Sequence, residues 1–82
     1  WTMRLVEHPV TVTATDGGPH FFQWRKKRYF VTAVLERWVD TGAWWENEPE
    51  KVFYRLLADD GGLYELYQER ISGCWFLYKV YD

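Results

Sequence analysis

The chain has little of what usually staples a small fold together. It contains one cysteine, Cys74, so no disulfide can form within it. Its two histidines, His8 and His20, stand apart from the cysteine and from each other, without the paired spacing of a zinc site. We therefore expect no cofactor and no metal, and a fold that depends on its own apolar packing or on a partner.

Long apolar runs and a strong excess of one charge are absent as well. No stretch approaches the roughly 20 apolar residues of a membrane-spanning helix, and the first residues lack the apolar centre of a signal peptide. The formal net charge is -2, from ten Lys and Arg against twelve Asp and Glu, which is unlike a typical duplex-DNA binder. Because an unpaired thiol fits a reducing compartment, we expect a cytoplasmic protein that does not engage a membrane.

Catalytic signatures are also missing from the sequence. The thiol of Cys74 has no basic neighbour in the sequence that would activate it as a nucleophile. The alternating Glu46, Glu48 and Glu50 resemble the carboxylate pairs used for acid–base hydrolysis, but such runs are usually solvated loops. The Asp-Gly-Gly motifs are turn chemistry and do not open a helix after a strand, as a phosphate-binding loop would. The sequence predicts a protein that is not an enzyme and has no small-molecule substrate.

Aromatic residues are what the chain has in abundance. Six Trp, six Tyr and five Phe make up 21% of its 82 residues. They gather in runs of alternating bulk that are bounded by turn residues, which is typical of β-strands. A chain this short cannot support two hydrophobic cores, so we expect a single β domain over residues 1–82.

The alternation predicts an all-β fold of about six antiparallel strands in a meander. The expected strands cover residues 9–15, 20–24, 28–35, 51–58, 63–69 and 74–81. Asp-Gly and Ser-Gly turns between aromatic runs are strong hairpin signals. Six strands are enough to form a small barrel or a strongly curled sheet, which hides most strand edges.

Residues 32–42 allow two interpretations. The helical spacing of Val34, Leu35 and Trp38 indicates a short helix over 33–40. The other interpretation is a long, bent strand, which we favour because the alternation of the third strand continues into this segment. The residues expected on one face of that strand are Tyr29, Val31, Ala33 and Leu35.

A compact basic run flanked by aromatic residues lies at the turn between the second and third expected strands. Cations interleaved with rings are typical of single-stranded nucleic-acid binding, since rings stack on bases and cations neutralise phosphates. The rings can equally be core, and a charged hairpin tip is also an ordinary aid to solubility. The candidate nucleic-acid-binding residues are Phe22, Trp24, Arg25, Lys26, Lys27 and Arg28.

Tryptophan and arginine gather in the middle of the chain, and both are preferred anchors of protein interfaces. If the loop over 43–50 is extended, its two adjacent tryptophans point to opposite faces, one into the core and one away from it. The candidate residues for a protein partner or a homo-oligomer are Arg37, Trp38, Trp44 and Trp45. Because a net charge of -2 weakens attraction to phosphate, we favour a protein-interaction adaptor, with single-stranded nucleic-acid binding as the alternative.

A further pattern of aromatic and glycine motifs extends along nearly the whole chain. It comprises Phe22, Trp24-Arg25, Arg28-Tyr29, Val31, Val34-Leu35, Arg37-Trp38, Gly42, Trp44-Trp45, Tyr54-Arg55, the run from Gly61 to Tyr67, Trp75, Leu77-Tyr78 and Val80-Tyr81-Asp82. In this pattern the chain resembles a small bacterial family of unassigned function, associated with actinobacterial and related genomes. Members lie near or attached to the polymerase-like subunit of a translesion mutagenesis cassette.

The resemblance implies a role as an accessory module in DNA-damage tolerance. It carries over no catalytic residues, because none is established for the family. The family usually has Gly after the Trp-Arg pair, whereas this chain has Lys26-Lys27 there. The departure makes the turn more basic and less typical of a hairpin.

Overall fold

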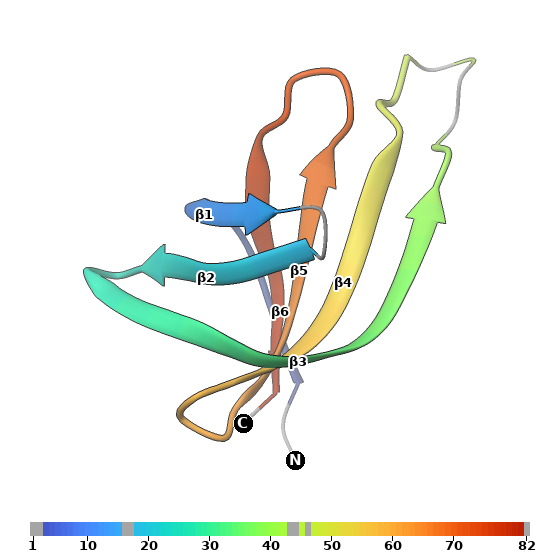
Figure 1. Ribbon diagram of the computed structural model, residues 1–82. Coiled ribbons are helices and arrows are strands. Elements are labelled where there is room, and N and C mark those ends of the chain that lie inside the picture. The colour runs from blue at the N-terminus through green and yellow to red at the C-terminus, as the bar shows by residue number, and fades with distance from the viewer. Residues whose placement is uncertain (1–2, 16–17, 43–44, 46, 82) are drawn as a thin grey trace.

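The computed structural model describes residues 3–15, 18–42, 45 and 47–81, and all structural statements concern these residues. Six antiparallel strands close into a barrel in sequence order, as Figure 1 shows, which confirms the predicted all-β meander. The strands are β1 (Met3–Thr15), β2 (Gly18–Trp24), β3 (Lys27–Asp40), β4 (Lys51–Ala58), β5 (Leu63–Glu69) and β6 (Trp75–Tyr81). None of the described residues belongs to a helix long and apolar enough to cross a membrane.

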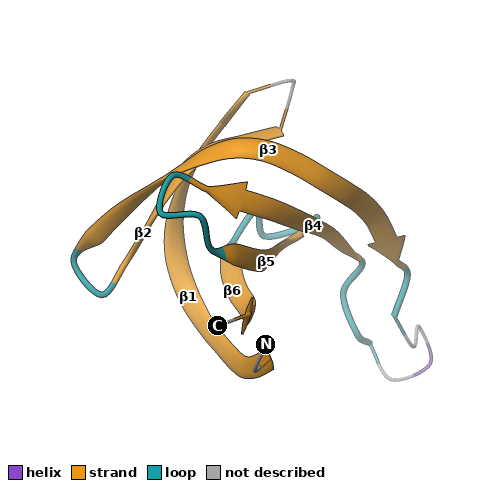
Figure 2. Cartoon of the chain, turned by 90° about the horizontal axis from the view of Figure 1, so that it is seen from below, coloured by secondary structure: helices purple, strands orange, loops and turns teal. Residues whose placement is uncertain are grey.

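β1 closes the barrel because it pairs with two different strands along its length. Its first part, up to Val10, pairs with β6, and its second part, from Thr11 on, pairs with β2. The pairing with β6 shifts in register between Leu5 and His8, and Glu7 in this interval has a positive φ of 49°. Such an irregularity bends a strand and increases its twist. Figure 2 shows the resulting curvature of β1.

β3 is the longest strand and also has two partners. It pairs with β2 up to Phe30 and with β4 from Val31 on. The alternative of a short helix over 33–40 is therefore wrong, and the long, bent strand is confirmed. Hydrogen bonds to a neighbouring strand decide the structure of a segment whose apolar spacing fits both a helix and a strand.

Two register shifts in β3 change which residues face the core. They lie between Val31 and Ala33 and between Val34 and Glu36. Leu35, expected on the same face as Tyr29, Val31 and Ala33, has no partner in the register with β4 and is exposed. Each shift adds a residue on one strand and so reverses the alternation that follows. A sequence pattern with a period of two residues cannot reveal such shifts.

The hydrophobic core fills the inside of the barrel. Its buried members are Phe22, Trp24, Tyr29, Leu56, Ala58, Tyr64, Leu66, Leu77 and Val80. Phe22 stacks on Tyr29 with ring centroids 4.9 Å apart, and Tyr64 meets Phe22 edge-on at 5.5 Å. Aromatic pairs of this kind contribute about 0.5–1.5 kcal/mol each beyond their buried area. Ring packing thus supplies cohesion in a chain without a disulfide.

The predicted turn after β4 is confirmed and is tied to β3. The amide of Asp59 donates to the carbonyl of Phe30 at 2.8 Å, and the amide of Phe30 donates to the Asp59 carboxylate at 3.2 Å. The Asp60 carboxylate accepts hydrogen bonds from the Gly62 amide at 2.8 Å and from the Tyr64 hydroxyl at 2.7 Å. The two hydrogen bonds between Asp59 and Phe30 hold the turn against β3.

Candidate binding surfaces

The outer face of the sheet formed by β3, β4, β5 and β6 carries a row of aromatic rings. Antiparallel sheets with one solvated face usually alternate apolar residues inward and polar residues outward. Here Trp38, Phe53, Tyr67 and Phe76 lie directly opposite one another on four adjacent strands. They alternate with core residues and are not part of the core cluster. We call these four residues the outer aromatic row.

The rings of the outer aromatic row cover one another. Trp38 and Phe53 are parallel with centroids 5.3 Å apart, Phe53 and Tyr67 are 5.2 Å apart, and Tyr67 and Phe76 are stacked at 5.0 Å. Tyr78 meets Phe53 and Tyr67 edge-on. The two central rings are each 7% exposed, whereas Trp38, Phe76 and Tyr78 are half-buried. The row is therefore a packed apolar surface that remains accessible at its two end rings, Trp38 and Phe76, and at the adjoining Tyr78.

Beside the rings lies a row of charges with alternating sign. Glu36, Arg55, Glu65 and Lys79 are directly opposite one another on the same four strands, and we call them the outer charged row. Arg55 bonds Glu36 at 2.6 Å and the Glu65 carboxylate at 3.2 Å. Although it lies outside the core, Glu65 is only 2% exposed. The charges of this face are thus held in place by their neighbours.

An apolar edge flanks the outer charged row on its other side. Leu57, Leu63, Tyr81 and Met3 follow one another across β4, β5, β6 and β1. Leu5 extends the outer charged row onto β1, where it lies opposite Lys79 and is 58% exposed. Contiguous apolar surface of this kind, with charges set into it, marks interaction sites in soluble proteins.

The structure separates the four residues predicted to bind a protein partner. Trp38 belongs to the outer aromatic row. Arg37, its neighbour in β3, points to the opposite face, where its guanidinium lies 6.0 Å from the ring centroid of Tyr54. Trp45 is exposed in the loop between β3 and β4, and Trp44 lies outside the described residues. One of these two tryptophans was expected to point into the core and the other away from it, and the structure describes only the exposed one, Trp45.

Sequence reasoning missed the partners of Trp38. Phe53, Tyr67 and Phe76 occur in strands that were predicted correctly, but both faces of those strands are rich in aromatic residues. One signal in the sequence could have revealed the outward residues: β4, β5 and β6 carry apolar residues at the positions of both faces. Such strands are expected where both faces are covered.

The second surface is the turn between β2 and β3, which carries the predicted basic run. Arg25 and Lys26 are its two central residues, with φ values of 53° and 63°. Two central residues with positive φ define a type I′ hairpin turn, which strongly prefers Asn-Gly or Gly-Gly. Residues other than glycine are strained in this conformation by about 1 kcal/mol or more. The chain therefore carries two cations at positions where glycine would fold more easily.

The structure corrects the aromatic part of the predicted nucleic-acid site. Phe22 is 0% and Trp24 is 6% exposed, because both point into the barrel, so neither ring face is available to a base. The outward rings of this hairpin are Phe21 and Phe30, which lie opposite each other with centroids 5.6 Å apart. Phe30 is 49% exposed, and the guanidinium of Arg28 lies 5.2 Å from the ring centroid of Phe21.

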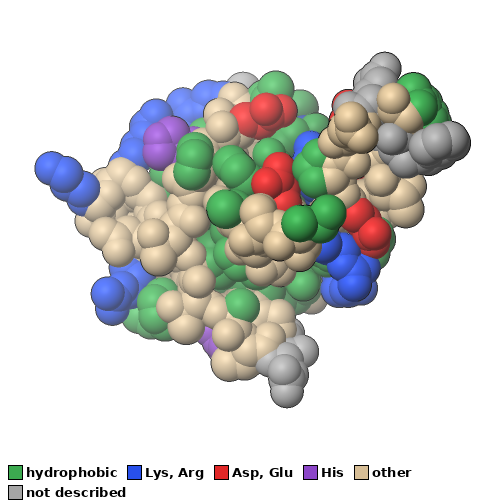
Figure 3. All heavy atoms as spheres, turned by 90° about the horizontal axis from the view of Figure 1, so that it is seen from above, with side chains coloured by type: hydrophobic (Ala, Val, Ile, Leu, Met, Phe, Trp, Pro, Cys, Tyr) green, Lys and Arg blue, Asp and Glu red, His purple; other side chains and the backbone are tan. Residues whose placement is uncertain are grey.

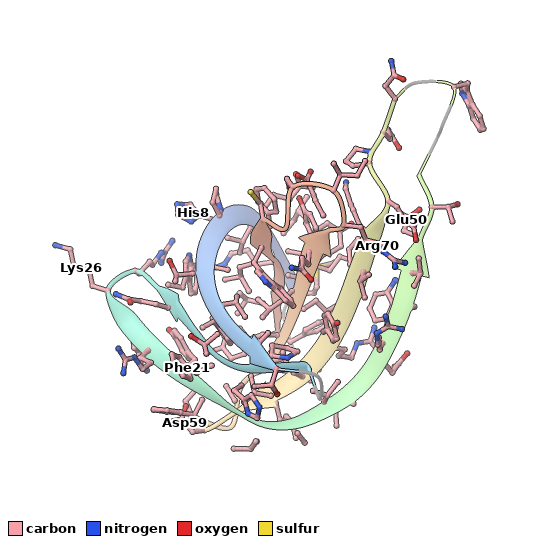
Figure 4. All side chains as sticks on the ribbon, turned by 45° about the horizontal axis from the view of Figure 1, so that its top comes forward. His8, Phe21, Lys26, Glu50, Asp59 and Arg70 are labelled. Atoms are coloured by element: carbon pink, nitrogen blue, oxygen red, sulfur yellow. The ribbon has the colours of Figure 1, made fainter. Side chains whose placement is uncertain are left out.

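A groove of about 370 Å³ adjoins the basic turn. Residues 8–11 of β1 line one side, and residues 23–26 of β2 and the turn line the other. The groove lies where β1 leaves β6 and begins to pair with β2. Figure 4 shows His8 and Lys26 on the same side of the barrel, at the two margins of the groove. Trp24 and Arg25 both line the groove, and the guanidinium of Arg25 lies 4.5 Å from the ring centroid of Trp24.

A protein-family model matches residues 2–82, nearly the whole chain. This chain belongs to the DUF6504 family. The family is described as a domain of unknown function, which agrees with the expected family of unassigned function and names no activity, ligand or partner. No curated protein and no solved structure matches the chain.

The two surfaces offer ring faces, cations and paired charges. Among the described residues, no group of three or more His, Cys, Asp or Glu side chains is placed to hold a metal ion. Cys74 is exposed just before β6.

Proposed function

We propose that this protein is a non-catalytic binding module that docks onto a protein partner through the outer face of β3, β4, β5 and β6. The observation that carries the proposal is the outer aromatic row, which stands where a solvated sheet face would carry polar side chains. Trp and Tyr are enriched at the centres of protein interfaces because they bury large areas at a small cost in side-chain entropy. The accessible rings are the half-buried Trp38, Phe76 and Tyr78.

The outer charged row gives the proposed docking face its specificity. Its charges alternate in sign, and ion pairs with Glu36 and Glu65 fix Arg55, so a partner must present complementary charges in matching order. Arg55 needs no reorganisation on binding because Glu36 and Glu65 already hold it. A face that combines fixed charges with apolar surface on both sides favours one partner over unrelated apolar surfaces.

The partner we propose to test first follows from the family resemblance. Because the resembled family lies near the polymerase-like subunit of a translesion mutagenesis cassette, we propose that the module is an accessory to DNA-damage tolerance and contacts that subunit. A cytoplasmic location fits this role and would keep the exposed thiol of Cys74 reduced. A second copy of the chain is the other partner that the same face could accept.

The test is a calorimetric titration of the purified polymerase-like subunit with the wild-type protein and three variants. Leu5→Glu places a carboxylate at an exposed position of β1 that borders the docking face beside Lys79, and Trp38→Ala removes one end of the outer aromatic row. We expect each to weaken binding at least tenfold. The matched control is Ile71→Glu, the same kind of change at an exposed residue of the turn between β5 and β6, and it should bind like wild type.

Two results would contradict the proposal. If Leu5→Glu and Trp38→Ala bind as wild type does, or if Ile71→Glu weakens binding equally, the docking face is wrong. If the wild-type protein binds neither the polymerase-like subunit nor, by sedimentation velocity, a second copy of itself, the proposed function is wrong. Circular dichroism of each variant establishes that it is folded.

A further inference from the structure

We propose that the outer face of the β2–β3 hairpin, together with the adjoining groove, binds single-stranded nucleic acid. The residues that carry this second site are Phe21, Gln23, Arg25, Lys26, Arg28 and Phe30. None of them belongs to the docking face of β3 to β6 described above, so the two surfaces can be tested separately.

The first argument is the availability of positive charge. Arg25, Lys26 and Arg28 are exposed, and none of them forms an ion pair with another described residue. The ammonium of Lys27 lies 4.9 Å from the ring centroid of Tyr29, and we leave Lys27 out of the site. Figure 3 shows Lys and Arg side chains gathered at the side of the molecule that carries the turn. Unpaired surface cations attract a phosphate backbone and release its counterions.

The second argument is a pair of outward-facing rings next to these cations. Phe21 and Phe30 lie opposite each other on the outer face of the hairpin, and nearly half of Phe30 is exposed. The planar guanidinium of Arg28 sits over Phe21. Aromatic rings and guanidinium planes are the groups on which unpaired bases stack, whatever their sequence. Figure 4 shows Phe21 on the hairpin that ends in Lys26.

The third argument is the order of these groups along the hairpin. Gln23 lies opposite Arg28, and the Phe21–Phe30 pair follows two residues further from the turn. The two rows are therefore about 7 Å apart along the strands. A backbone held by cations at the turn can run past the polar row to the rings. Gln23 is exposed between them and can donate to or accept from a base edge.

The groove beside the turn can hold the first nucleotide of the bound single-stranded nucleic acid. Its volume of about 370 Å³ lies near the lower end of the roughly 300–1,000 Å³ found for ligand sites, which suits one nucleotide better than a large ligand. Arg25 and Lys26 stand at its margin and are held there by the strained turn. Strain of this kind persists at sites where the side chain matters more than the ease of folding.

Single strands fit this surface better than duplexes do. In a duplex the bases are stacked on one another, so Phe21 and Phe30 would find no free base face. A duplex would engage only the cations, and three available cations are few for a protein whose net charge is -2. Phe21 and Phe30 therefore favour single-stranded over double-stranded nucleic acid.

The test is fluorescence anisotropy with a labelled single-stranded DNA of about 12 nucleotides, a length within the site sizes of small β modules. We expect binding at about 50 mM salt that weakens at least tenfold at about 200 mM. Phe30→Ala should weaken binding by about 5-fold to 100-fold, the effect of one lost stacking partner. The double variant Arg25→Glu/Lys26→Glu should abolish binding.

The matched control reverses two other charges. Arg4→Glu/Lys79→Glu changes the net charge by the same amount on strands β1 and β6, and it should bind like wild type. Leu5→Glu, which disrupts the proposed docking face, should also bind the oligonucleotide normally. This last variant keeps the failure of one proposal distinguishable from the failure of the other.

Three results would overturn the inference. The first is no anisotropy change at concentrations that saturate a control single-strand binder. The second is unchanged affinity of Phe30→Ala, or equal affinity for duplex and single strand, either of which means that the rings take no part. The third is an equal loss in Arg4→Glu/Lys79→Glu, which would reduce the effect to net charge.

Discussion

On the outer face of the barrel, the guanidinium of Arg55 lies 3.2 Å from the carboxylate of Glu65, which is buried. The hydroxyl of Tyr81 donates to the same carboxylate oxygen at 2.5 Å. Burial alone would lower the pKa of Arg55, but its hydrogen bond to Glu65 and the charges of Glu65 and Glu36 outweigh that effect and raise the pKa. The network links β3, β4, β5 and β6 across the proposed docking face.

Removing Arg55 should therefore cost much more stability than removing its exposed partner. Arg55→Met leaves the Glu65 carboxylate buried and removes both N–H groups of Arg55 that donate to it, and we expect the free energy of unfolding to fall by about 3 kcal/mol. Glu36→Gln, at a residue on the exposed end of the network, should cost about 0.5 kcal/mol or less. Urea denaturation followed by circular dichroism measures both. Equal losses of unfolding free energy in the two variants would show that the Arg55–Glu65 pair contributes no more to stability than the exposed Arg55–Glu36 pair.

The stability of the protein should decline in alkali. Burial, followed by the hydrogen bond to Asp60, raises the pKa of Tyr64, and the hydrogen bond to Glu65, followed by burial, raises the pKa of Tyr81. The unfolded chain releases these phenol protons near pH 10.0, whereas the folded protein holds them. The tyrosine contribution is thus complete below pH 10 and is lost as the pH rises toward the folded-state pKa values.

Thermal unfolding between about pH 9 and 11 checks this expectation, with tyrosine ionisation followed by its absorbance. Tyr64→Phe should be less stable at neutral pH by about 1 kcal/mol, because the hydrogen bond to Asp60 is lost. Its melting temperature should then fall less steeply with alkaline pH than that of wild type. Parallel curves for the two proteins would exclude Tyr64 as a source of the alkaline loss.

Replacing Lys26 by glycine should stabilise the fold while weakening binding at the proposed nucleic-acid site. Lys26 has a φ of 63°, which glycine adopts without strain. We expect Lys26→Gly to raise the free energy of unfolding by about 0.5–1 kcal/mol and to lower oligonucleotide affinity. The control is Lys79→Gly in β6, which should lose about 0.5–1 kcal/mol because glycine is unfavourable within a strand. Destabilisation by Lys26→Gly would contradict the strained-turn interpretation.

The two glycines after Asp60 should respond differently to alanine. A Cβ at Gly62 would lie 2.8 Å from the ring of the buried Tyr64, which cannot move without disturbing the core. Gly61 has open space around it and a φ of 79°, so alanine there meets only backbone strain. We expect a loss of about 2–3 kcal/mol for Gly62→Ala and about 1 kcal/mol for Gly61→Ala. Chemical denaturation of both variants decides whether the order is correct.

Local signals account for the parts of the fold that the sequence predicted well. β4 and β5 begin and end where expected, at 51–58 and 63–69, because the Asp-Gly-Gly turn and the aromatic alternation lie within a few residues of each other. β1 begins at Met3, well before the predicted residue 9. Its first part lacks a clean alternation and is held by pairing with β6. That partner lies at the other end of the chain.

The choice of faces shows where sequence reasoning stops. Phe21 and Phe22 are adjacent aromatic residues, and a period of two residues cannot say which one is buried. Pairing with Phe30 and Tyr29 decides it, since the inward ring of one strand must meet the inward ring of the next. The shifts in β3 decide in the same way that Trp38 meets Phe53 on the outside.

The sequence by itself determined the all-β class, the meander and the basic turn, because each depends on interactions between residues close together in the chain. Only the tertiary structure decided that β1 closes the barrel, that Trp38 and its neighbouring rings lie on the outer face, and that Phe21 and Phe30 face outward where Phe22 and Trp24 were expected. These features depend on the register between strands. Register is set by hydrogen bonds and bulges that join distant segments, and the local pattern does not encode them.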